Sequence, residues 1–285
     1  MATATALALA LPGSKAPLAL AADVPPNLAR LLLRSASYVR DFQRSFSEVV
    51  SSEHYEQTVR RTGGRISQMR HIESEMFFAA VGDGAASMTI RNVTRVDGHR
   101  VPDSHDRVMR VLSSRRIDRT ESLRALAVEG ARFDIGNVGR VFNDPTLVLM
   151  FFTQAMQSRF QFVTDGSERI DGVVTYRIKF SETVRPSVIR NEPADLDTVV
   201  SGIAHLAEDG RIVRTDLSVA IGARRSARIR VRYQRDGNVE MLVPVSMDED
   251  YRNDDGPGRG VSLISRNATY SDYQRLQASA RTLPR

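Results

Sequence analysis

The sequence predicts an α+β protein that is mainly antiparallel β: a curved, unclosed-barrel meander sheet packed on a long N-terminal helix and a helical insert. The first observation behind this fold class is the alternation of apolar and polar residues in four runs between Gly172 and Tyr251. A period of two places alternate side chains on one face of a strand, so one face of this sheet is apolar and the other polar. Asp209-Gly210 and Asp236-Gly237 lie between runs, and Asp-Gly pairs are typical of tight hairpins. The members of the four runs that share the apolar face are Val174, Tyr176, Ile178, Phe180, Val213, Thr215, Leu217, Val219, Ile221, Ala227, Ile229, Val231, Tyr233, Val239, Met241, Val243, Val245 and Met247.

The composition fits a globular protein of ordinary hydrophobic content. Of the 285 residues, 41% are hydrophobic, which excludes disorder over most of the length. We expect a single domain over residues 23–275, with a helical insert at residues 103–157. The sequence has no run of about 18 apolar residues, so no transmembrane helix is expected.

The net charge of +6 comes almost entirely from arginines that are scattered through the chain. A nucleic-acid-binding protein would carry a clustered basic stripe with interleaved aromatic residues, so we expect no nucleic-acid partner. The sequence contains no cysteine, which excludes disulfides, thiol nucleophiles, thiolate metal sites and an acylated cysteine.

Residues 1–22 are rich in Ala and Leu and end in a small-x-small pattern, Ala19-Leu20-Ala21, before Ala22. This pattern is typical of a secretory signal peptide with its cleavage site after Ala21. Against a signal peptide, no Lys or Arg opens the segment, and Pro12-Gly13-Ser14-Lys15 interrupts its apolar core. The alternative is a disordered tail. At the other end, residues 276–285 are expected to be frayed.

A long amphipathic helix is expected from Asn27, which follows two prolines and fits an N-cap. Apolar residues then recur at three- and four-residue spacing, as on one stripe of a helix. The polar side mixes Arg, Asp, Glu and Ser, which fits a core helix better than a helix lying on a membrane. We therefore expect this helix to pack on the apolar face of the sheet. Its stripe consists of Leu28, Leu31, Leu32, Val39, Phe42, Phe46, Val49 and Val50.

Further strands extend the meander before and after the four runs. Turn signals rich in Gly and Asp separate them, as in consecutive hairpins. We expect Asp165-Gly166 to be another turn and residues 248–260 to form a polar loop. The additional strands are expected at residues 53–61, 65–81 (one long strand or two short ones), 86–96, from 99, from 158 and 261–273.

The helical insert is expected to begin with a short helix from Asp103 to Leu112, followed by a capped helix at Asp118. Asn143-Asp144-Pro145 then begins a helix whose residues 147–152 are all apolar. A helix that is apolar on every side must be buried.

Patterns for catalysis or metal binding are weak. The five histidines show no paired metal-ligand spacing, and His105 fits a solvated helix start better than a metal site. The acidic residues at 248–255 lack the alternation of a calcium-binding loop. Glu73 and Glu75 would share a strand face, as a carboxylate pair for acid–base work does, but no other motif places a substrate beside them. We therefore predict no catalytic residue, no metal ligand and no cofactor.

The apolar sheet face and the apolar helices allow two arrangements. Either the helices fill the concave face completely and form a closed core, or they leave a cavity that suits an acyl chain or another apolar ligand. The sequence pattern alone does not separate the two. The residues predicted to line such a cavity are Phe151, Phe152, Val174, Tyr176, Ile178, Phe180, Leu217, Val219, Ile229, Val231, Tyr233, Met241 and Val243.

Two local patterns, residues 204–215 (AHLAEDGRIVRT) and residues 268–273 (ATYSDY), add to the order of the elements. Together they resemble the periplasmic lipoprotein-carrier (LolA/LolB-like) superfamily, within an uncharacterised group of exported bacterial proteins. The resemblance covers residues 28–275 and implies an unclosed barrel with a hydrophobic cavity covered by helices. The chain has no lipid-anchor cysteine, and the functional arginine of the carriers cannot be assigned among so many. No binding residue is therefore carried over.

These observations predict an exported, soluble protein of the bacterial periplasm or extracellular space. It would bind a hydrophobic or lipidic ligand, such as a lipid or acyl chain, in the concave face without catalysis, with the insert at residues 103–157 as a movable lid. The alternative is an interaction or scaffolding protein of the cell envelope, with envelope proteins as partners, a closed core and no ligand. A third interpretation, a hydrolase, requires Glu73, Glu75 or His105 to converge in one cleft.

Overall fold

The computed structural model of the chain describes residues 27–47, 49–61, 63–81, 86–104, 106, 108, 125–136, 144–189, 198–254, 256 and 260–275. Several sequence predictions lie outside the described residues: the signal peptide or tail at 1–22, the capped helix at Asp118, the candidate residue His105 and the frayed end at 276–285. The short helix from Asp103 is described only in part, with helical backbone at residues 104, 106 and 108.

The described residues form one antiparallel sheet of eleven strands, which confirms the predicted fold class. Its order is β4-β3-β2-β1-β11-β10-β9-β8-β7-β6-β5, and β4 and β5 are its two edges, so the sheet does not close into a barrel. Neighbours in the sheet are consecutive in sequence except at one place, as in a meander. The strands are β1 (Val49–Arg61), β2 (Ile66–Val81), β3 (Ala86–Val96), β4 (His99–Arg100), β5 (Phe160–Ile170), β6 (Val173–Glu182), β7 (Thr198–Ala207), β8 (Ile212–Ile221), β9 (Arg225–Asp236), β10 (Met241–Asp254) and β11 (Val261–Arg275).

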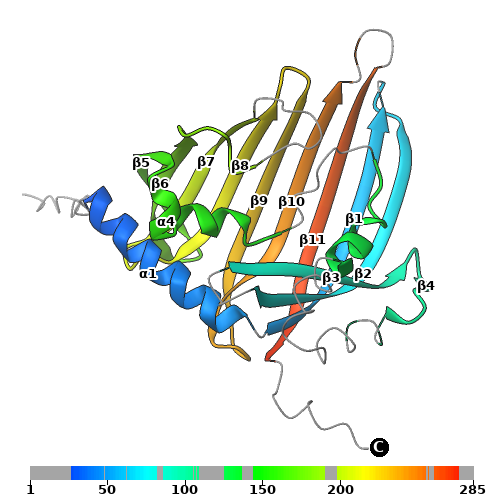
Figure 1. Ribbon diagram of the computed structural model, residues 1–285, viewed down its shortest axis with the longest axis horizontal. Coiled ribbons are helices and arrows are strands. Elements are labelled where there is room, and N and C mark those ends of the chain that lie inside the picture. Colours follow the sequence, from blue (N-terminus) through cyan, green and yellow to red (C-terminus); the bar gives the residue numbers. More distant parts are fainter. Residues whose placement is uncertain are drawn as a thin grey trace, which may run out of the picture.

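The exception is the pairing of the first strand with the last. β1 pairs antiparallel with β11, from Val49 opposite Arg275 to Arg61 opposite Ser262. This pairing joins two meanders, β1–β4 and β5–β11, into one sheet, and the predicted insert lies between them in the chain. Figure 1 shows that the sheet curls at one side, so that β3 crosses in front of β11.

The N-terminal helix α1 (Leu28–Phe46) lies on one face of this sheet (Figure 1). Asn27 caps it as predicted, because its side-chain oxygen accepts a hydrogen bond from the N–H of Ala29 at 2.9 Å. The buried residues of α1 repeat at helical spacing and include four of the eight residues of the predicted stripe. They are Leu31, Ser35, Val39, Phe42 and Phe46.

The helix is shorter than the sequence predicts. It stops before Ser47, whose hydroxyl donates a hydrogen bond to the carbonyl of Arg44 at 2.9 Å. Val49 and Val50 were assigned to the helical stripe, which is wrong, because both belong to β1. They follow Phe46 at three and four residues, so their spacing alone cannot distinguish a last helical turn from the start of a strand.

Helical segments of the insert lie on the same face as α1 (Figure 1). Residues 125–131 are helical, η1 (Leu147–Phe152) is a 3₁₀ helix, and α4 (Gln154–Gln157) follows it. The prediction that the all-apolar segment must be buried is confirmed, since Val148, Leu149, Phe151 and Phe152 are buried.

Three strand predictions need correction. Asp165-Gly166 is not a turn: β5 continues through it, and Gly166 lies at an irregularity of the ladder with φ +88°, as in a β-bulge. Residues 248–254 are not a loop but the second half of β10, because charged residues there continue the two-residue period outward while Glu249 and Tyr251 are buried. β7 was not predicted as a run, since Gly202 and other small residues interrupt its alternation.

The predicted apolar face is the face that the helices cover. Ile229, Val231 and Tyr233 are 3%, 2% and 2% exposed, so the two-residue period assigned the faces of β9 correctly. We call this covered side the concave face of the sheet. In the part of the chain that the structure describes, no helix combines the length and apolar content needed to cross a membrane.

Candidate ligand-binding site on the concave face

The concave face divides into two regions, of which the first is apolar. This apolar region comprises the inward side chains of β5–β9, the first residues of β10 and the residues of η1. All the residues predicted to line a cavity belong to the hydrophobic core cluster or pack against it, and this cluster continues into side chains of β1, β2 and β11. They are buried, except Val174 and Met241, which are half-buried. The structure therefore brings these residues together, and their contact with a ligand stays a prediction.

Phenylalanine rings from the insert and the sheet form the centre of the apolar region. Phe151 stacks on Phe160 with ring centroids 4.7 Å apart. Phe180 of β6 meets Phe151 and Phe152 edge-on, with centroids at 5.8 and 6.0 Å. Offset and edge-on ring pairs stabilise a core beyond the burial of their area. These rings anchor η1 on the sheet.

Gly202 of β7 provides space for this ring cluster. It lies directly opposite Phe180 in the β6–β7 ladder. A Cβ atom at this position would lie 2.5 Å from Cζ of Phe180 and 2.2 Å from the carbonyl oxygen of Asp216, which is closer than real Cβ contacts. Gly202 interrupts the apolar alternation of β7, and in the structure its missing side chain leaves room for the Phe180 ring over the backbone.

Among the described residues, the segment from Pro145 to Gln157 has few polar contacts with the rest of the molecule. The hydroxyl of Tyr233 donates to the carbonyl of Pro145 at 2.6 Å. Nε2 of Gln157 donates to the carbonyls of Leu32 and Phe152, both at 2.9 Å, and so links α4 to α1 and η1. Among the described residues, no backbone-to-backbone hydrogen bond joins residues 125–136 or 144–157 to a strand. In these described segments, the cover is thus attached to the sheet by side chains and not by a β-ladder.

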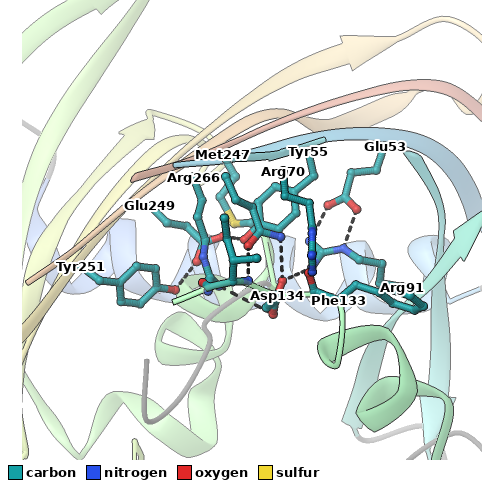
Figure 2. Close-up of polar contacts among 12 residues, drawn as sticks. Glu53, Tyr55, Arg70, Arg91, Phe133, Asp134, Met247, Glu249, Tyr251 and Arg266 are labelled. Carbon is teal, nitrogen blue, oxygen red and sulfur yellow. Dashed lines mark hydrogen bonds and ion pairs between the residues drawn. The ribbon is translucent and has the colours of Figure 1, made fainter. Parts of the chain in front are cut away.

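The second region of the concave face is polar (Figure 2). This polar region comprises inward side chains of β1–β3, β10 and β11 together with residues 133–135 of the insert. Its tightest contact is a bidentate ion pair: Nε and Nη2 of Arg91 each donate to the carboxylate of Glu53 at 2.6 Å. The guanidinium also lies over the ring of Tyr55, 4.2 Å from its centroid. The side chains of Arg91 and Glu53 are 3% and 0% exposed, so the pair is desolvated and strongly coupled.

Asp134 reaches from the insert to a position between two arginines. One carboxylate oxygen lies 3.8 Å from Nη1 of Arg91 and the other 3.7 Å from Nη1 of Arg266. These are ion-pair distances, but they are longer than hydrogen bonds. Figure 2 shows the guanidinium groups of Arg91 and Arg266 on opposite sides of this carboxylate.

Gln57 and Arg266 fasten the backbone of the insert at this point. Nε2 of Gln57 donates to Oδ1 of Asp134 at 3.1 Å, and its Oε1 accepts from the N–H of Ile135 at 2.8 Å. Nη2 of Arg266 donates to the carbonyl of Ile135 at 2.9 Å. Side chains of β1 and β11 thus replace the strand partner that this short segment lacks.

The insert also packs closely against the sheet around these bonds. Nη1 of Arg70 donates to the carbonyl of Phe133 at 2.9 Å. At Gly136, with φ +85°, a Cβ atom would lie 2.9 Å from Cγ1 of Ile264 on β11. At Gly130, a Cβ atom would lie 2.5 Å from a carbonyl oxygen of β3. The two glycines let the insert backbone approach the sheet.

Glu249 of β10 is a third buried carboxylate in the polar region. It accepts hydrogen bonds from the hydroxyls of Tyr55, at 2.7 Å, and Tyr251. Burial raises the pKa of the Glu249 carboxyl, against the opposing charge of Arg266. Burial also raises the pKa of Asp134, against the charges of the two flanking arginines. Both shifts favour proton uptake, which brings three carboxylates and two arginines toward neutrality.

Sequence reasoning missed the polar region. The inward face of β1 carries Glu53 and Gln57, so this strand shows no apolar alternation to mark its inner side. A signal was present in the last two strands, where the two-residue period places Glu249 after Met247 and Arg266 between apolar residues. A charged residue at an inward position of an alternating strand is the pattern that would have indicated the region.

Glu73 and Glu75, which were considered for acid–base chemistry, have separate partners, and His105 lies outside the described residues. Glu73 forms an ion pair with Arg95 at 3.5 Å, and both side chains are largely exposed. Glu75 accepts a hydrogen bond from Nδ2 of Asn92 at 3.0 Å. The acidic residues near the end of β10 separate to opposite faces: Glu249 is inward, whereas Asp250 is outward and accepts from Arg230 at 2.9 Å. Among the described residues, no group of three or more His, Asp or Glu is placed to hold a metal ion.

Two open depressions occur on other parts of the surface. One, of about 350 Å³, is lined largely by outward side chains of β7–β11, including exposed Leu263, and borders Val219. The other, of about 520 Å³, lies beside Arg34 of α1 and the β7–β8 turn and borders Val174. Neither lies over the ring cluster at the centre of the apolar region.

No family model matches the chain, and no curated protein matches its sequence. Among solved structures, the chain is similar to a DUF1329 family protein from Desulfovibrio piger (11% identity, TM-score 0.37, covering 87% of this chain and 97% of that one). It is similar to a putative outer membrane lipoprotein-sorting protein domain from Vibrio parahaemolyticus (9% identity, TM-score 0.37, covering 86% and 94%). It is also similar to a LolA superfamily protein from Nitrosomonas europaea (10% identity, TM-score 0.29, covering 87% and 97%). The last of these structures carries the name of the superfamily that the sequence resembles.

Proposed function

We propose that this protein is exported and binds a hydrophobic or lipidic ligand on its concave face without chemistry. The observation that supports the proposal is the way in which helices cover the apolar region. The apolar region spans several strands, and it is covered by η1 and α1 through rings and aliphatic side chains, not by a second sheet. Contacts of this kind are non-directional, so an acyl chain of similar volume can take the place of the covering side chains.

In this mechanism the insert at residues 103–157 acts as a movable lid. Each buried methylene of an acyl chain contributes about 0.8 kcal/mol, so a chain of about ten methylenes gains roughly 8 kcal/mol on leaving water. This gain must exceed the cost of moving η1 off the rings of β5 and β6. The sparse polar tethers of η1 and α4 keep that cost low, because few hydrogen bonds must be broken.

Native mass spectrometry after gentle extraction tests the proposal. We expect the protein to carry co-purified lipid and, once delipidated, to bind a fluorescent fatty acid with saturation at one site. A protein that never co-purifies with lipid and does not bind the fluorescent fatty acid is not a carrier. The mature N-terminus, determined on protein secreted to the periplasm of a bacterial host, tests export: cleavage after Ala21 is expected.

One observation favours a second candidate, an interaction or scaffolding protein of the cell envelope with a closed core. Most of the residues predicted to line a cavity are already buried by protein. If the cover never moves, the working surface is the outer one, where Arg228 pairs with Asp216 and Arg230 with Asp250. Co-purification of a stoichiometric envelope protein in the absence of lipid would support this candidate over the carrier.

A further inference from the structure

Two buried arginines on the concave face have N–H groups that donate no hydrogen bond to the described part of the chain. Arg266 is 0% exposed and Arg91 is 4% exposed. Arg91 directs Nε and Nη2 to Glu53, and Arg266 directs Nη2 to the carbonyl of Ile135. Nη1 of Arg91 and both Nε and Nη1 of Arg266 make no hydrogen bond within the described part of the chain. Buried donors of charged groups are costly to leave without an acceptor.

The two Nη1 atoms face the same carboxylate, that of Asp134, at 3.8 and 3.7 Å. Asp134 supplies the negative charge that this position requires but does not approach closely enough to accept either hydrogen bond. Its own Oδ2 makes no hydrogen bond within the described residues. The geometry is therefore that of an anion site occupied by an internal anion with incomplete contacts.

The other buried carboxylates of the polar region are already engaged. Glu53 is bound by Arg91 through both oxygens, and Glu249 accepts hydrogen bonds from two tyrosine hydroxyls. Asp134 differs from both because it is carried by the insert and not by a strand. If residues 133–135 move away from the sheet, Arg266 loses Asp134 and the carbonyl of Ile135 together. Arg266 would then retain the charge of Glu249, whose oxygens are engaged by tyrosine hydroxyls, but would lack a hydrogen-bond acceptor, which favours binding of another anion.

The polar region is continuous with the apolar region. Glu249 lies directly opposite Ile229 in the β9–β10 ladder, and Met247 lies opposite Val231. From Arg266 on β11 to the rings on β6 the distance is five strand spacings, about 24 Å. This matches the length of an extended long-chain fatty acid, so one molecule can reach from the arginines to the phenylalanine cluster.

We propose that the polar region binds the anionic headgroup of an amphiphilic ligand, a carboxylate or a phosphate monoester, which takes the position of the Asp134 carboxylate between Arg91 and Arg266. The proposal rests on the proposed function, since the acyl chain of the same ligand would lie on the apolar region. It makes Asp134 an internal competitor: residues 133–135 lie against the sheet when no anion is present and yield when one binds.

Isothermal titration calorimetry of the delipidated full chain tests this with three probes that share a twelve-carbon chain. Such a chain spans about three strand spacings and so reaches from Arg266 on β11 to the apolar side chains of β8. Dodecanoate and dodecyl phosphate carry anionic headgroups, and dodecanol carries none. We expect at least one anionic probe to bind about tenfold or more tightly than dodecanol, which is the effect of one charge-assisted hydrogen bond. The tighter of the two anions identifies the headgroup chemistry.

Two variants locate the effect. Asp134→Asn removes the internal competitor, so the affinity for the anionic probe should rise about tenfold while that for dodecanol stays unchanged. Arg266→Gln should bring the affinity for the anion down to that for dodecanol. Asp216→Asn is the matched control, because it also removes one carboxylate paired with an arginine, but on the outer face, and it should change neither affinity. Circular dichroism melting curves identify variants that do not fold.

The outcomes separate this proposal from the function on which it rests. Equal affinities for all three probes would overturn the headgroup site and leave apolar ligand binding intact. Weaker anion binding in the folded Asp134→Asn variant would also overturn it, because Asp134 would then support the site rather than compete for it. If no probe binds, the proposed function fails and the headgroup site fails with it. If the Arg266→Gln variant does not fold, the result for the Asp134→Asn variant still tests the proposal.

Discussion

In the apolar region, η1 is held on the sheet by rings and aliphatic side chains, whereas in the polar region residues 133–135 are held by directed hydrogen bonds and ion pairs. Apolar contacts depend on volume and area, so another apolar molecule can replace one partner. Directed contacts depend on matched donors and acceptors, and loss of one partner leaves a costly buried group. The comparison teaches that the contacts of η1 can be replaced by those of another apolar molecule, whereas the contacts of residues 133–135 fix the position of the insert on the sheet.

The largest expected effect is in the apolar region. Phe180→Ala removes the ring that meets Phe151 and Phe152 and should lower the free energy of unfolding by about 3 to 5 kcal/mol. Urea unfolding followed by circular dichroism measures it. Val199→Ala, at a position 50% exposed on the neighbouring strand, is the control and should change the free energy by less than about 0.5 kcal/mol. A loss below about 1 kcal/mol for Phe180→Ala would mean that this ring does not pack as described.

In the polar region, Glu53→Gln should lower the free energy of unfolding by about 3 kcal/mol, because it leaves Arg91 buried without its counter-charge. Replacing both partners, as Glu53→Gln with Arg91→Met, should restore part of that loss, since no buried charge then remains. A double variant that is as unstable as the sum of its single variants would show that the two side chains do not act as a pair.

A buried histidine on the outer face, His205, makes the stability of the protein depend on pH. Burial, followed by the charge of Arg214, lowers the pKa of His205 from 6.5 to about 4, although Nδ1 lies 3.0 Å from Glu168. Because the folded pKa is below the unfolded one, its contribution to stability is fully present above pH 6.5 and is lost as the pH falls through 4. One pKa unit corresponds to about 1.4 kcal/mol, so the change in pKa from 6.5 to about 4 corresponds to a loss of roughly 3 to 4 kcal/mol from this group.

Urea unfolding at pH 7 and at pH values approaching 4 measures this loss, and His205→Gln should reduce the slope with pH. The buried carboxyls of Asp134 and Glu249 act with the opposite sign. Their folded pKa values are raised, so their contribution is present at low pH and is lost as the pH rises through the folded values. If His205→Gln leaves the pH dependence unchanged, the histidine is not the group that titrates.

The smallest effect is local. Gln57→Ala removes both hydrogen bonds to Asp134 and the N–H of Ile135, at a cost of about 1 to 2 kcal/mol. Hydrogen–deuterium exchange should become about tenfold faster at residues 133–136 and stay unchanged in η1. Gln161→Ala, at an exposed position of β5, serves as the control. Equally faster exchange in η1 would mean that the two parts of the cover open together.

Much of the fold could be predicted because its meander is local. In β6 and β8–β10 the apolar residues alternate and the connections are short, so period and turn chemistry suffice to place the faces. The pairing of β1 with β11 could not be predicted, since nothing in either strand specifies a partner at the far end of the chain. β7 could not be predicted for a different reason. Gly202 carries no side chain, and its role depends on the ring of Phe180, which lies on another strand.

The apolar half of the candidate site was predictable for the same reason as the meander, since its members are the alternating residues themselves. The polar half was not. Glu249 was assigned to an acidic loop, and Arg266 is one of many scattered arginines. Arg266 pairs with Asp134, which comes from the insert and meets it only in the folded chain. A single charged residue in a strand does not reveal whether a partner from elsewhere will cover it.

Photo-crosslinking measures most directly whether the concave face takes an acyl chain. A fatty acid with a diazirine near its methyl end would be bound to the protein, irradiated and located by peptide mass spectrometry. The structure predicts adducts in residues 147–152, 174–180 and 229–233, which form the apolar region. Adducts confined to outward residues such as Val199 and Leu263, with none in those segments, would contradict it.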